Sequence, residues 1–431
     1  MKDGAKPCGP RTKKDIVSGK AAEEMKDIDR IGPVSLYLHF PFCVRKCRYC
    51  DFLSGPASEE ERDNYIDLLC REIRLRAFEV PGSVDTIFMG GGTPSIMTPA
   101  QLQALMNCLR ETFQILPDAE ISMEVNPGTA DGEKLRAFRK SGVNRLSIGV
   151  QSFDDAELRL LGRIHTSQEA REIFHAAREA GFTNLNLDLM SALPGQKMET
   201  WAHTLREAVA LGPEHLSAYS LIIEEGTLFA SMQLPALPSE EEDRAMYHFT
   251  KQFLSENGYR RYEISNYARE GYACKHNGGY WTGHDYLGLG LGASSLMGSE
   301  RFKNPDRMEA YRKAVLAGDC MGLRQERELL SQEDQMEEFM FLGLRMTDGV
   351  SVEEYQRRFG EPVEKRFGEV IEKHLRQGLI CRKTVEVGGA SLHCGVPCQE
   401  SAKTDGAIDH RLALTEYGLD VANYVMADYI L

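Results

Sequence analysis

Apolar and polar positions follow a regular order along the chain from Ser35 to about residue 300. Short apolar runs of strand length alternate with longer segments whose apolar residues recur at helical spacing. The runs predict strands at Ser35–Phe40, Asp85–Met89, Glu120–Val125, Arg145–Val150, Asn184–Met190 and Leu216–Ile222. Strands that alternate with helices form parallel βαβ units with right-handed crossovers. Six such units predict an α/β fold built as an open, partial (β/α)6 barrel.

Helix start signals lie in the gaps between these strands. Four of them have the capping-box pattern, in which a Ser or Thr precedes a Glu or Gln by three positions. They are Ser58-x-x-Glu61, Thr98-Pro99-x-Gln101, Thr166-x-x-Glu169 and Ser239-x-x-Glu242. Each signal follows a predicted strand, as the barrel requires.

The alternation stops near Arg301, and a different pattern follows. Helical spacing predicts helices at Arg307–Ala317, Gln332–Leu344, Val352–Phe359, Val363–Gln377 and Thr415–Ala427, with a strand at Leu379–Val387. Helices followed by a hairpin are typical of a winged-helix-like domain. Residues 1–33 are polar and charged without a strong strand, which predicts a flexible arm. We therefore expect an arm at 1–33, a barrel at 34–300 and a mainly helical C-terminal cap domain at 301–431.

Polar and glycine-rich motifs follow the predicted strands at their carboxyl ends. A cysteine loop follows the first strand, and five further motifs follow or end the others: Gly90–Pro94, Glu124-x-Asn126-Pro127, Gly149–Ser152, Asp188–Met190 and Tyr219-Ser220. Folds of this kind place their active sites at this rim. Any one motif has an ordinary structural explanation, as a turn or a strand-end cap. Their common position on one rim favours a functional site.

Composition and charge exclude several classes of protein. A formal net charge of −14 and a pI near 5.4 argue against an extended nucleic-acid surface. No apolar run approaches membrane-spanning length, although peripheral membrane contact stays open. The N-terminus lacks the apolar segment of a secretory signal. Eleven unevenly spaced cysteines without such a signal suggest a reducing, cytoplasmic location.

The strongest chemical signal is the run Cys43-Val-Arg-Lys-Cys47-Arg-Tyr-Cys50. Three thiolates on one short loop can hold three corners of a [4Fe–4S] cluster, which leaves the fourth iron open to a small molecule. A structural zinc site needs four closed ligands. A c-type haem site needs a His after Cys50, where Asp51 stands. A disulfide framework belongs to small secreted chains. The run therefore predicts an iron–sulfur cluster.

The C-x3-C-x2-C loop, with the aromatic Tyr49 before its last cysteine, resembles the signature of the radical S-adenosylmethionine (SAM) superfamily. Further motifs resemble the oxygen-independent coproporphyrinogen III dehydrogenase group of that superfamily. They are Tyr37-Leu-His39-x-Pro41-Phe42-Cys43, Gly90–Pro94, Gly149-Val-Gln151-Ser152, Leu161-Gly162-Arg163-x-His165, Asp188–Gln196 and Ile223-Glu224-x-Gly226-Thr227. The resemblance covers the chain from about Val34 to the C-terminus and is specific in combination.

Two details place the chain within that group. The dehydrogenases carry a further cysteine two positions after the third, and this chain has Phe52 there. The run His276-Asn277-Gly278-Gly279-Tyr280-Trp281 is similar to the haem-binding motif of the haem-chaperone branch. Ser191-Ala192 departs from the family, which usually has an aromatic residue and a glycine at these positions.

The resemblance implies a role for each motif. Cys43, Cys47 and Cys50 would ligate the cluster, and SAM would chelate the open iron. Tyr37 and Tyr49 would flank the cluster and SAM. The backbone of Gly91, Gly92 and Thr93 would meet the methionine end of SAM, and Glu124, Gln151, Arg163, Asp188 and Ser220 would contact its polar groups. For Glu124 and Asp188 a strand-end cap is the alternative, and for Arg163 a helix-end salt bridge.

The same resemblance implies haem as a ligand, with His276 as a candidate for the iron. Neutral imidazole binds haem iron well, and Tyr280 and Trp281 would offer aromatic walls to a porphyrin plane. A buried structural histidine is the alternative. The implied partners are a haem-acceptor protein, such as a respiratory enzyme, and an electron donor to the cluster.

Three functions fit these motifs. The first is a haem chaperone that binds haem and a SAM-liganded [4Fe–4S] cluster and transfers haem to acceptor proteins. The second is a coproporphyrinogen III dehydrogenase, which oxidatively decarboxylates two propionates with SAM as oxidant. The third is a SAM-dependent methyltransferase that opens haem for iron release. Because binding and turnover of a tetrapyrrole use the same rim motifs, the sequence leaves open whether the protein is an enzyme.

Cys381, His393, Cys394 and Cys398 form a second group of metal-ligating residue types. Their spacing matches no zinc template, because Cys394 and Cys398 do not form a C-x2-C pair. We expect loop thiols rather than a metal site.

Overall fold

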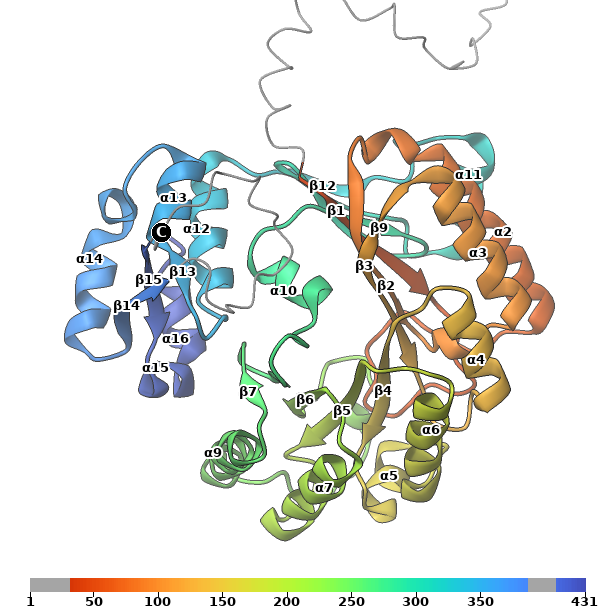
Figure 1. Ribbon diagram of the computed structural model, residues 1–431, viewed down its shortest axis with the longest axis horizontal. Helices are drawn as coiled ribbons and strands as arrows, with labels where there is room; N and C mark the ends of the chain where they lie inside the picture. The colour runs from red at the N-terminus through yellow and green to blue at the C-terminus, as the bar shows by residue number, and fades with distance from the viewer. Residues whose placement is uncertain (1–31, 387–407) are drawn as a thin grey trace, which may run out of the picture. The chain divides into compact units, whose positions relative to one another are not determined.

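The core of the protein is a row of parallel strands that curves around an interior cavity (Figure 1). The computed structural model describes residues 32–386 and 408–431. The six predicted strands are confirmed, with shifts of one or two residues at most ends, but the third begins at Gln114 rather than at Glu120. They are β1 (Val34–Phe40), β2 (Ser83–Gly91), β3 (Gln114–Val125), β4 (Arg145–Gln151), β5 (Leu185–Ser191) and β6 (His215–Ser220). All five pairings between successive strands are parallel, as the alternating pattern predicts.

Helices cover the outer face of these strands (Figure 1). They are α2 (Glu59–Leu75), α3 (Pro99–Thr112), α4 (Gly132–Lys140), α5 (Asp155–Leu161), α6 (Ser167–Glu179), α7 (Met198–Leu211) and α9 (Glu240–Glu256). The short helix α8 (Leu228–Ser231) instead contacts the cysteine loop, where the N–H of Phe229 donates to the carbonyl of Arg48 at 2.9 Å. Short 3-10 turns lie at Ala77–Glu79 and Pro94–Ile96. The capping boxes predicted at Ser58, Thr98, Thr166 and Ser239 are all present. The predicted α/β barrel is confirmed.

Short strands extend the sheet at both edges, to twelve strands in the order β12-β11-β10-β9-β1-β2-β3-β4-β5-β6-β8-β7. The added strands are β7 (Arg260–Arg261), β8 (Asn266–Ala268), β9 (Tyr286–Leu289), β10 (Ser294–Met297), β11 (Glu300–Lys303) and β12 (Gln325–Leu329). The sequence pattern missed them because they are short and several adjoin glycines. Strand β9 is parallel to β1 and carries the barrel sheet one strand further.

The C-terminal part has the predicted helices and hairpin. Its elements are α11 (Met308–Ala317), α12 (Gln332–Gly343), β13 (Val350–Ser351), α13 (Val352–Phe359), α14 (Val363–Arg376), β14 (Ile380–Glu386), β15 (Ile408–Leu414), α15 (Glu416–Asp420) and α16 (Ala422–Ala427). The predicted last helix is divided into α15 and α16. Strands β13, β15 and β14 form a separate antiparallel sheet.

Two large hydrophobic clusters contain most of the buried apolar residues that the structure describes from Pro33 onward. The larger cluster packs the barrel and extends to Tyr311, Val315 and Leu323. The smaller cluster begins at Met336 and contains the C-terminal helices. The strands β11 and β12 thus belong to the barrel sheet, and α11 packs in the larger cluster. The expected arm, residues 1–33, lies almost wholly outside the described residues.

Helix α10 (Lys275–Trp281) packs against both β2 and α12, on the inner side of the curved sheet (Figure 1). This helix carries His276 and therefore places it inside the barrel. Nowhere in residues 32–386 and 408–431 is a helix both long and apolar enough to cross a bilayer.

Candidate functional site

A cavity of about 480 Å³ occupies the interior of the barrel. Side chains alternate between the two faces of a strand, so every second residue of a barrel strand points inward. On β4 the lining residues are Arg145, Ser147, Gly149 and Gln151, whereas Leu146, Ile148 and Val150 pack in the outer core. The same alternation holds on β5 and β6, where Asn186, Asp188, Met190, His215, Ser217 and Tyr219 line the cavity. These three strands therefore place a series of polar side chains along the cavity wall.

The three cysteines of the loop after β1 all line this cavity. Backbone hydrogen bonds hold the loop at both of its sides. The N–H of Cys43 donates to the carbonyl of Gly55 at 2.9 Å, and the N–H of Arg48 donates to that of Leu161 at 3.0 Å. None of the three is in a disulfide. Burial raises the pKa of the Cys43 and Cys50 thiols, so binding of a metal must displace their protons.

The donor set fits a [4Fe–4S] cluster better than a single metal ion. Among the described residues no three His, Cys, Asp or Glu side chains converge as ligands of one ion. Thiolates of a cubane cluster bind separate corners and need no common centre. Three thiols on one cavity-lining loop fit that arrangement, and the fourth iron of such a cluster would have no ligand from this loop.

A glycine loop after β2 fixes the start of the cysteine loop. Gly92 donates its N–H to the carbonyl of Phe40 at 2.8 Å, and Thr93 donates to that of Phe42 at 2.7 Å. A Cβ on Gly92 would lie 2.4 Å from the Phe42 oxygen, so only glycine fits. Gly91 donates its N–H to the Glu124 carboxylate at 3.1 Å. Gly91, Gly92 and Thr93 line the cavity as expected, but their N–H groups are donated within the protein.

Two buried carboxyl groups lie on the cavity wall. Burial, and then the charge of Asp188, raises the pKa of Glu124 to about 8. Burial also raises the pKa of Asp188, which accepts hydrogen bonds from Ser147 at 2.9 Å and Asn186 at 2.8 Å. Buried carboxyl groups on a cavity wall are suited to meeting a cationic or hydroxyl-bearing ligand.

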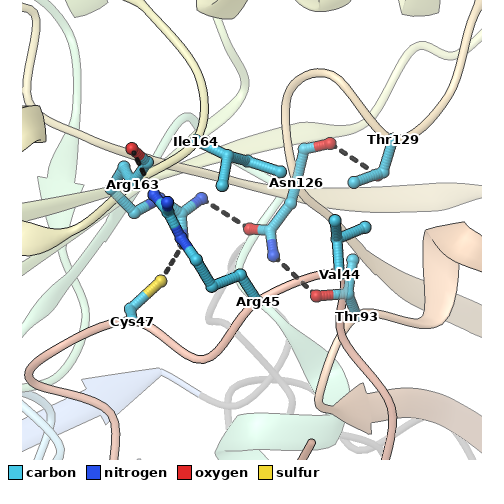
Figure 2. Close-up of a pocket in the computed structure, with 8 residues that line it drawn as sticks. All are labelled: Val44, Arg45, Cys47, Thr93, Asn126, Thr129, Arg163 and Ile164. Carbon is cyan, nitrogen blue, oxygen red and sulfur yellow. Dashed lines mark hydrogen bonds between the residues drawn. The ribbon is translucent and has the colours of Figure 1, made fainter. Parts of the chain in front are cut away.

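Arg163 connects the cysteine loop with the ends of two strands (Figure 2). Its Nη1 lies 3.6 Å from Cys47 Sγ, and its Nη2 donates to Asn126 Oδ1 at 2.6 Å and to the carbonyl of Gly149. Asn126 in turn donates to Thr93 Oγ1 at 2.8 Å. In Figure 2 these side chains surround a small pocket beside Val44, Arg45 and Ile164. Arg163 is thus a rim residue and not a helix-end salt bridge.

The remaining rim residues differ in where they point. Tyr37, Tyr49 and Gln151 line the cavity, and Gln151 has the positive φ of 69° that strained functional residues often adopt. Ser220 does not belong with them, because its hydroxyl donates to Asp243 at 2.9 Å on the exposed side. Residues alternate faces along β6, so Tyr219 rather than Ser220 lines the cavity.

His276 lies in the wall of the same cavity and is 2% exposed. Its Nδ1 is 2.7 Å from Thr86 Oγ1, and its Nε2 is 2.9 Å from the Tyr280 hydroxyl. The ring stacks on Phe88 at a centroid distance of 5.2 Å. Burial lowers the pKa of His276 to about 3, so the imidazole is neutral. A neutral imidazole is the form that binds iron.

Sequence reasoning missed the deep polar layer of the cavity. Its members are Arg145, Ser147, Asn186, His215, Ser217, Asn266 and Cys274. A signal was present, because β4 reads Arg-Leu-Ser-Ile-Gly-Val-Gln, with polar residues or glycine at alternate positions. Of the second cysteine group, Cys381 is a free thiol on β14, and His393, Cys394 and Cys398 lie outside the described residues.

Comparison with known proteins agrees with this geometry. Residues 37–208 match the family model of the radical SAM superfamily, and residues 330–384 match that of the HemN C-terminal domain. The second match begins at residue 330, close to Met336, where the smaller hydrophobic cluster begins.

Several curated relatives are similar over most of their length. Heme chaperone HemW of Bacillus subtilis is 37% identical over 352 residues, which cover 80% of this chain and 92% of the relative. Heme chaperone HemW of Lactococcus lactis is 38% identical, with 76% and 85% covered. The mouse protein named radical S-adenosyl methionine domain-containing protein 1, mitochondrial, is 38% identical, with 67% and 68% covered.

Among solved structures, coproporphyrinogen III oxidase (HemN) of Escherichia coli, a radical SAM enzyme, superimposes with a TM-score of 0.77. The two chains are 25% identical, and the superposition covers 96% of this chain and 93% of the other. The HemN structure therefore shares the whole architecture, whereas the HemW relatives are more alike in sequence. The chain belongs to the HemW family of radical SAM proteins.

Proposed function

We propose that this protein is a haem chaperone, which binds haem and a SAM-liganded [4Fe–4S] cluster and transfers haem to acceptor proteins such as respiratory enzymes. Its relatives in Bacillus subtilis and Lactococcus lactis are named Heme chaperone HemW. The observation that carries the proposal is the position of His276. A neutral histidine from the H-N-G-G-Y-W run lines the same cavity as the three cysteines.

Cys43, Cys47 and Cys50 would hold the cluster as thiolates, with the amino and carboxylate groups of SAM on the open iron. When bound, this pair supplies one-electron chemistry at the sulfonium of SAM. The protein's own contribution is to orient the cofactors and exclude water. Tyr37 and Tyr49 would flank them.

Glu124, Gln151, Arg163 and Asp188 would contact the polar groups of SAM. Their cavity-lining positions support this assignment, and the buried carboxyl groups complement a cationic ligand. Arg163 would also hold Cys47 in place through its 3.6 Å contact. The N–H groups of Gly91, Gly92 and Thr93 are already donated, so carbonyl oxygens are what this loop would offer.

His276 would bind the haem iron through Nε2. The Thr86 contact holds the other nitrogen, and a fixed Nδ1 partner is typical of histidines that bind metals. Tyr280 would have to release Nε2, since its hydroxyl occupies that nitrogen in the structure. Phe88, which stacks on the imidazole, keeps the ring in one plane.

An anaerobic haem titration of the cluster-reconstituted protein tests the proposal. Wild type should bind haem saturably, His276→Ala should bind it at least about tenfold more weakly, and the exposed-site control His203→Ala should match wild type. The loaded wild type should then pass haem to a haem-free acceptor. Absence of haem binding by wild type would overturn the proposal.

A second candidate, coproporphyrinogen III dehydrogenase, rests on the superposition with HemN. Phe52 stands where that group has its further cysteine, so this chain has no thiol at that position. The Phe52 side chain is 63% exposed. Anaerobic incubation with coproporphyrinogen III, SAM and a reductant separates the two functions. Formation of protoporphyrinogen would favour the enzyme, and its absence from protein with an intact cluster would exclude it.

A further inference from the structure

Arg145 lies deep in the barrel, far from the cysteine loop. It begins β4 on the inward face and lines the cavity, yet it is 2% exposed. Gly149, which contacts Arg163 at the rim, follows four residues later on the same strand. At about 3.3 Å per residue, Arg145 is roughly 13 Å below the rim.

The guanidinium of Arg145 is almost without partners. Its only hydrogen bond in the described structure is a long one of 3.5 Å, from Nη1 to Ser122 Oγ. Its Nε has no partner, and no carboxylate of a described residue lies within ion-pair distance. A buried cation without a partner is strongly unfavourable.

The carboxylates that face Arg145 are bonded elsewhere. Glu120 accepts from the backbone N–H groups of Lys275 at 3.0 Å and His276 at 3.3 Å. Asp188 accepts from Ser147 and Asn186. Both attract the guanidinium through space, but neither accepts a hydrogen bond from it.

Arg76 shows how the same chain satisfies a buried arginine that has a structural role. It is also fully buried, and it donates to Glu72, Glu79, Asn304 and the carbonyl of Gly288 at 2.9 to 3.1 Å. Arg145 has none of these ionic partners and faces a cavity, which is the arrangement of an anion-binding residue.

We propose that Arg145 binds a carboxylate of the tetrapyrrole, that is, a propionate side chain. The planar guanidinium fork matches a carboxylate in bidentate geometry. SAM has a single carboxylate, which is assigned to the iron at the rim, so the partner of Arg145 is a different ligand. The aromatic faces of Phe88, His276 and Tyr280 line the same cavity and suit a flat ring. This inference rests on the proposed function.

Comparison of haem with its dimethyl ester tests the inference on the full, cluster-reconstituted chain. The ester keeps the iron and the ring but lacks the propionate charge. Wild type should bind haem at least about tenfold more tightly than the ester. Arg145→Met should lose this preference by weakening haem alone, and the exposed control Arg136→Met should keep it.

Each outcome has one reading. Equal binding of haem and ester by wild type would overturn the inference and leave the chaperone function standing. Retention of the preference in Arg145→Met would also overturn it. Failure of wild type to bind either ligand would overturn both. If Arg145→Met does not fold, Arg145→Lys, which keeps the charge but not the fork, should show a reduced preference.

Discussion

The Nδ1 of His276 lies 2.7 Å from the Oγ1 of Thr86, a residue of barrel strand β2. The Thr86 hydroxyl donates to Ser35 Oγ at 2.8 Å, so it accepts a hydrogen bond from Nδ1–H. The proton of the neutral imidazole is thereby assigned to Nδ1, and Nε2 accepts from Tyr280 at 2.9 Å. The contact with strand β2 thus fixes the Nδ1–H tautomer of His276. The lone pair of Nε2 then accepts a hydrogen bond from the Tyr280 hydroxyl.

Replacement of Tyr280 by Phe should therefore strengthen haem binding. The change removes the hydroxyl that competes for Nε2 and keeps the aromatic ring. A neutral hydrogen bond contributes about 0.5–1.5 kcal/mol, which corresponds to a two- to tenfold lower Kd. Haem titration by absorbance measures the change. Tyr286→Phe is the matched control, because the Tyr286 ring packs edge-on against Tyr280 at a centroid distance of 4.7 Å, and no hydrogen bond joins Tyr286 to His276 in the described structure. Unchanged or weaker binding in Tyr280→Phe would argue against iron ligation by Nε2.

Loss of one loop cysteine should remove the cluster, and loss of a different cavity cysteine should not. We expect Cys47→Ser to abolish the reconstituted cluster, measured as iron and sulfide per chain. Cys274→Ser is the control, since Cys274 lines the same cavity but its thiol faces Glu120 at 3.4 Å. Burial raises the pKa of Cys274 to about 12, which keeps it a neutral thiol. Full iron content in Cys47→Ser would contradict the assignment of the loop.

Glu124 should contribute stability to the cluster-free protein that is lost as pH rises from about 5 to 8. The pKa of Glu124 is raised to about 8 by burial, whereas a glutamate in an unfolded chain titrates near 4.3. The folded state then holds a proton that the unfolded state releases, so the contribution of Glu124 to the free energy of unfolding is largest below about pH 4.3. It declines by up to about 1.4 kcal/mol per pH unit until Glu124 ionises.

Urea unfolding at several pH values measures this slope, with Glu124→Gln as the comparison. The amide cannot ionise, so the stability of wild type relative to Glu124→Gln should fall as pH rises through this range. Some dependence should remain in the variant, because burial also raises the pKa of Asp188. Equal slopes for the two proteins would show that Glu124 is ionised in the folded state.

The barrel was predictable because strand runs and capping boxes agree with each other. The edge strands β9 to β12 were not predicted, because such short segments show no clear alternation of apolar and polar residues. The cysteine loop was found from spacing alone. Arg145 was missed because a polar residue within a strand is normally predicted to face solvent. The sequence pattern does not show that the barrel strands enclose a cavity. Ser220 was assigned one position from Tyr219, which is enough to move a side chain to the other face.

A buried ionic network joins helix α2 to the edge of the sheet that the sequence pattern missed. Arg76 and Glu72 are both 0% exposed, and Glu72 also accepts from Asn304 at 2.6 Å and Tyr311 at 2.7 Å. These partners come from the end of β11 and from α11, more than two hundred residues away in sequence.

We expect Arg76→Met to lower the free energy of unfolding by about 3–5 kcal/mol, because it leaves Glu72 and Glu79 buried without a counter-charge. Urea unfolding of the cluster-free protein measures this loss. Arg71→Met, on the exposed face of the same helix, should change stability by less than about 0.5 kcal/mol. The double replacement of Arg76 by Met and Glu72 by Gln should recover part of the lost stability, because it removes one of the two carboxylates left buried without a counter-charge. A small effect of Arg76→Met alone would mean that water reaches the network and that α11 is held to the barrel by apolar packing.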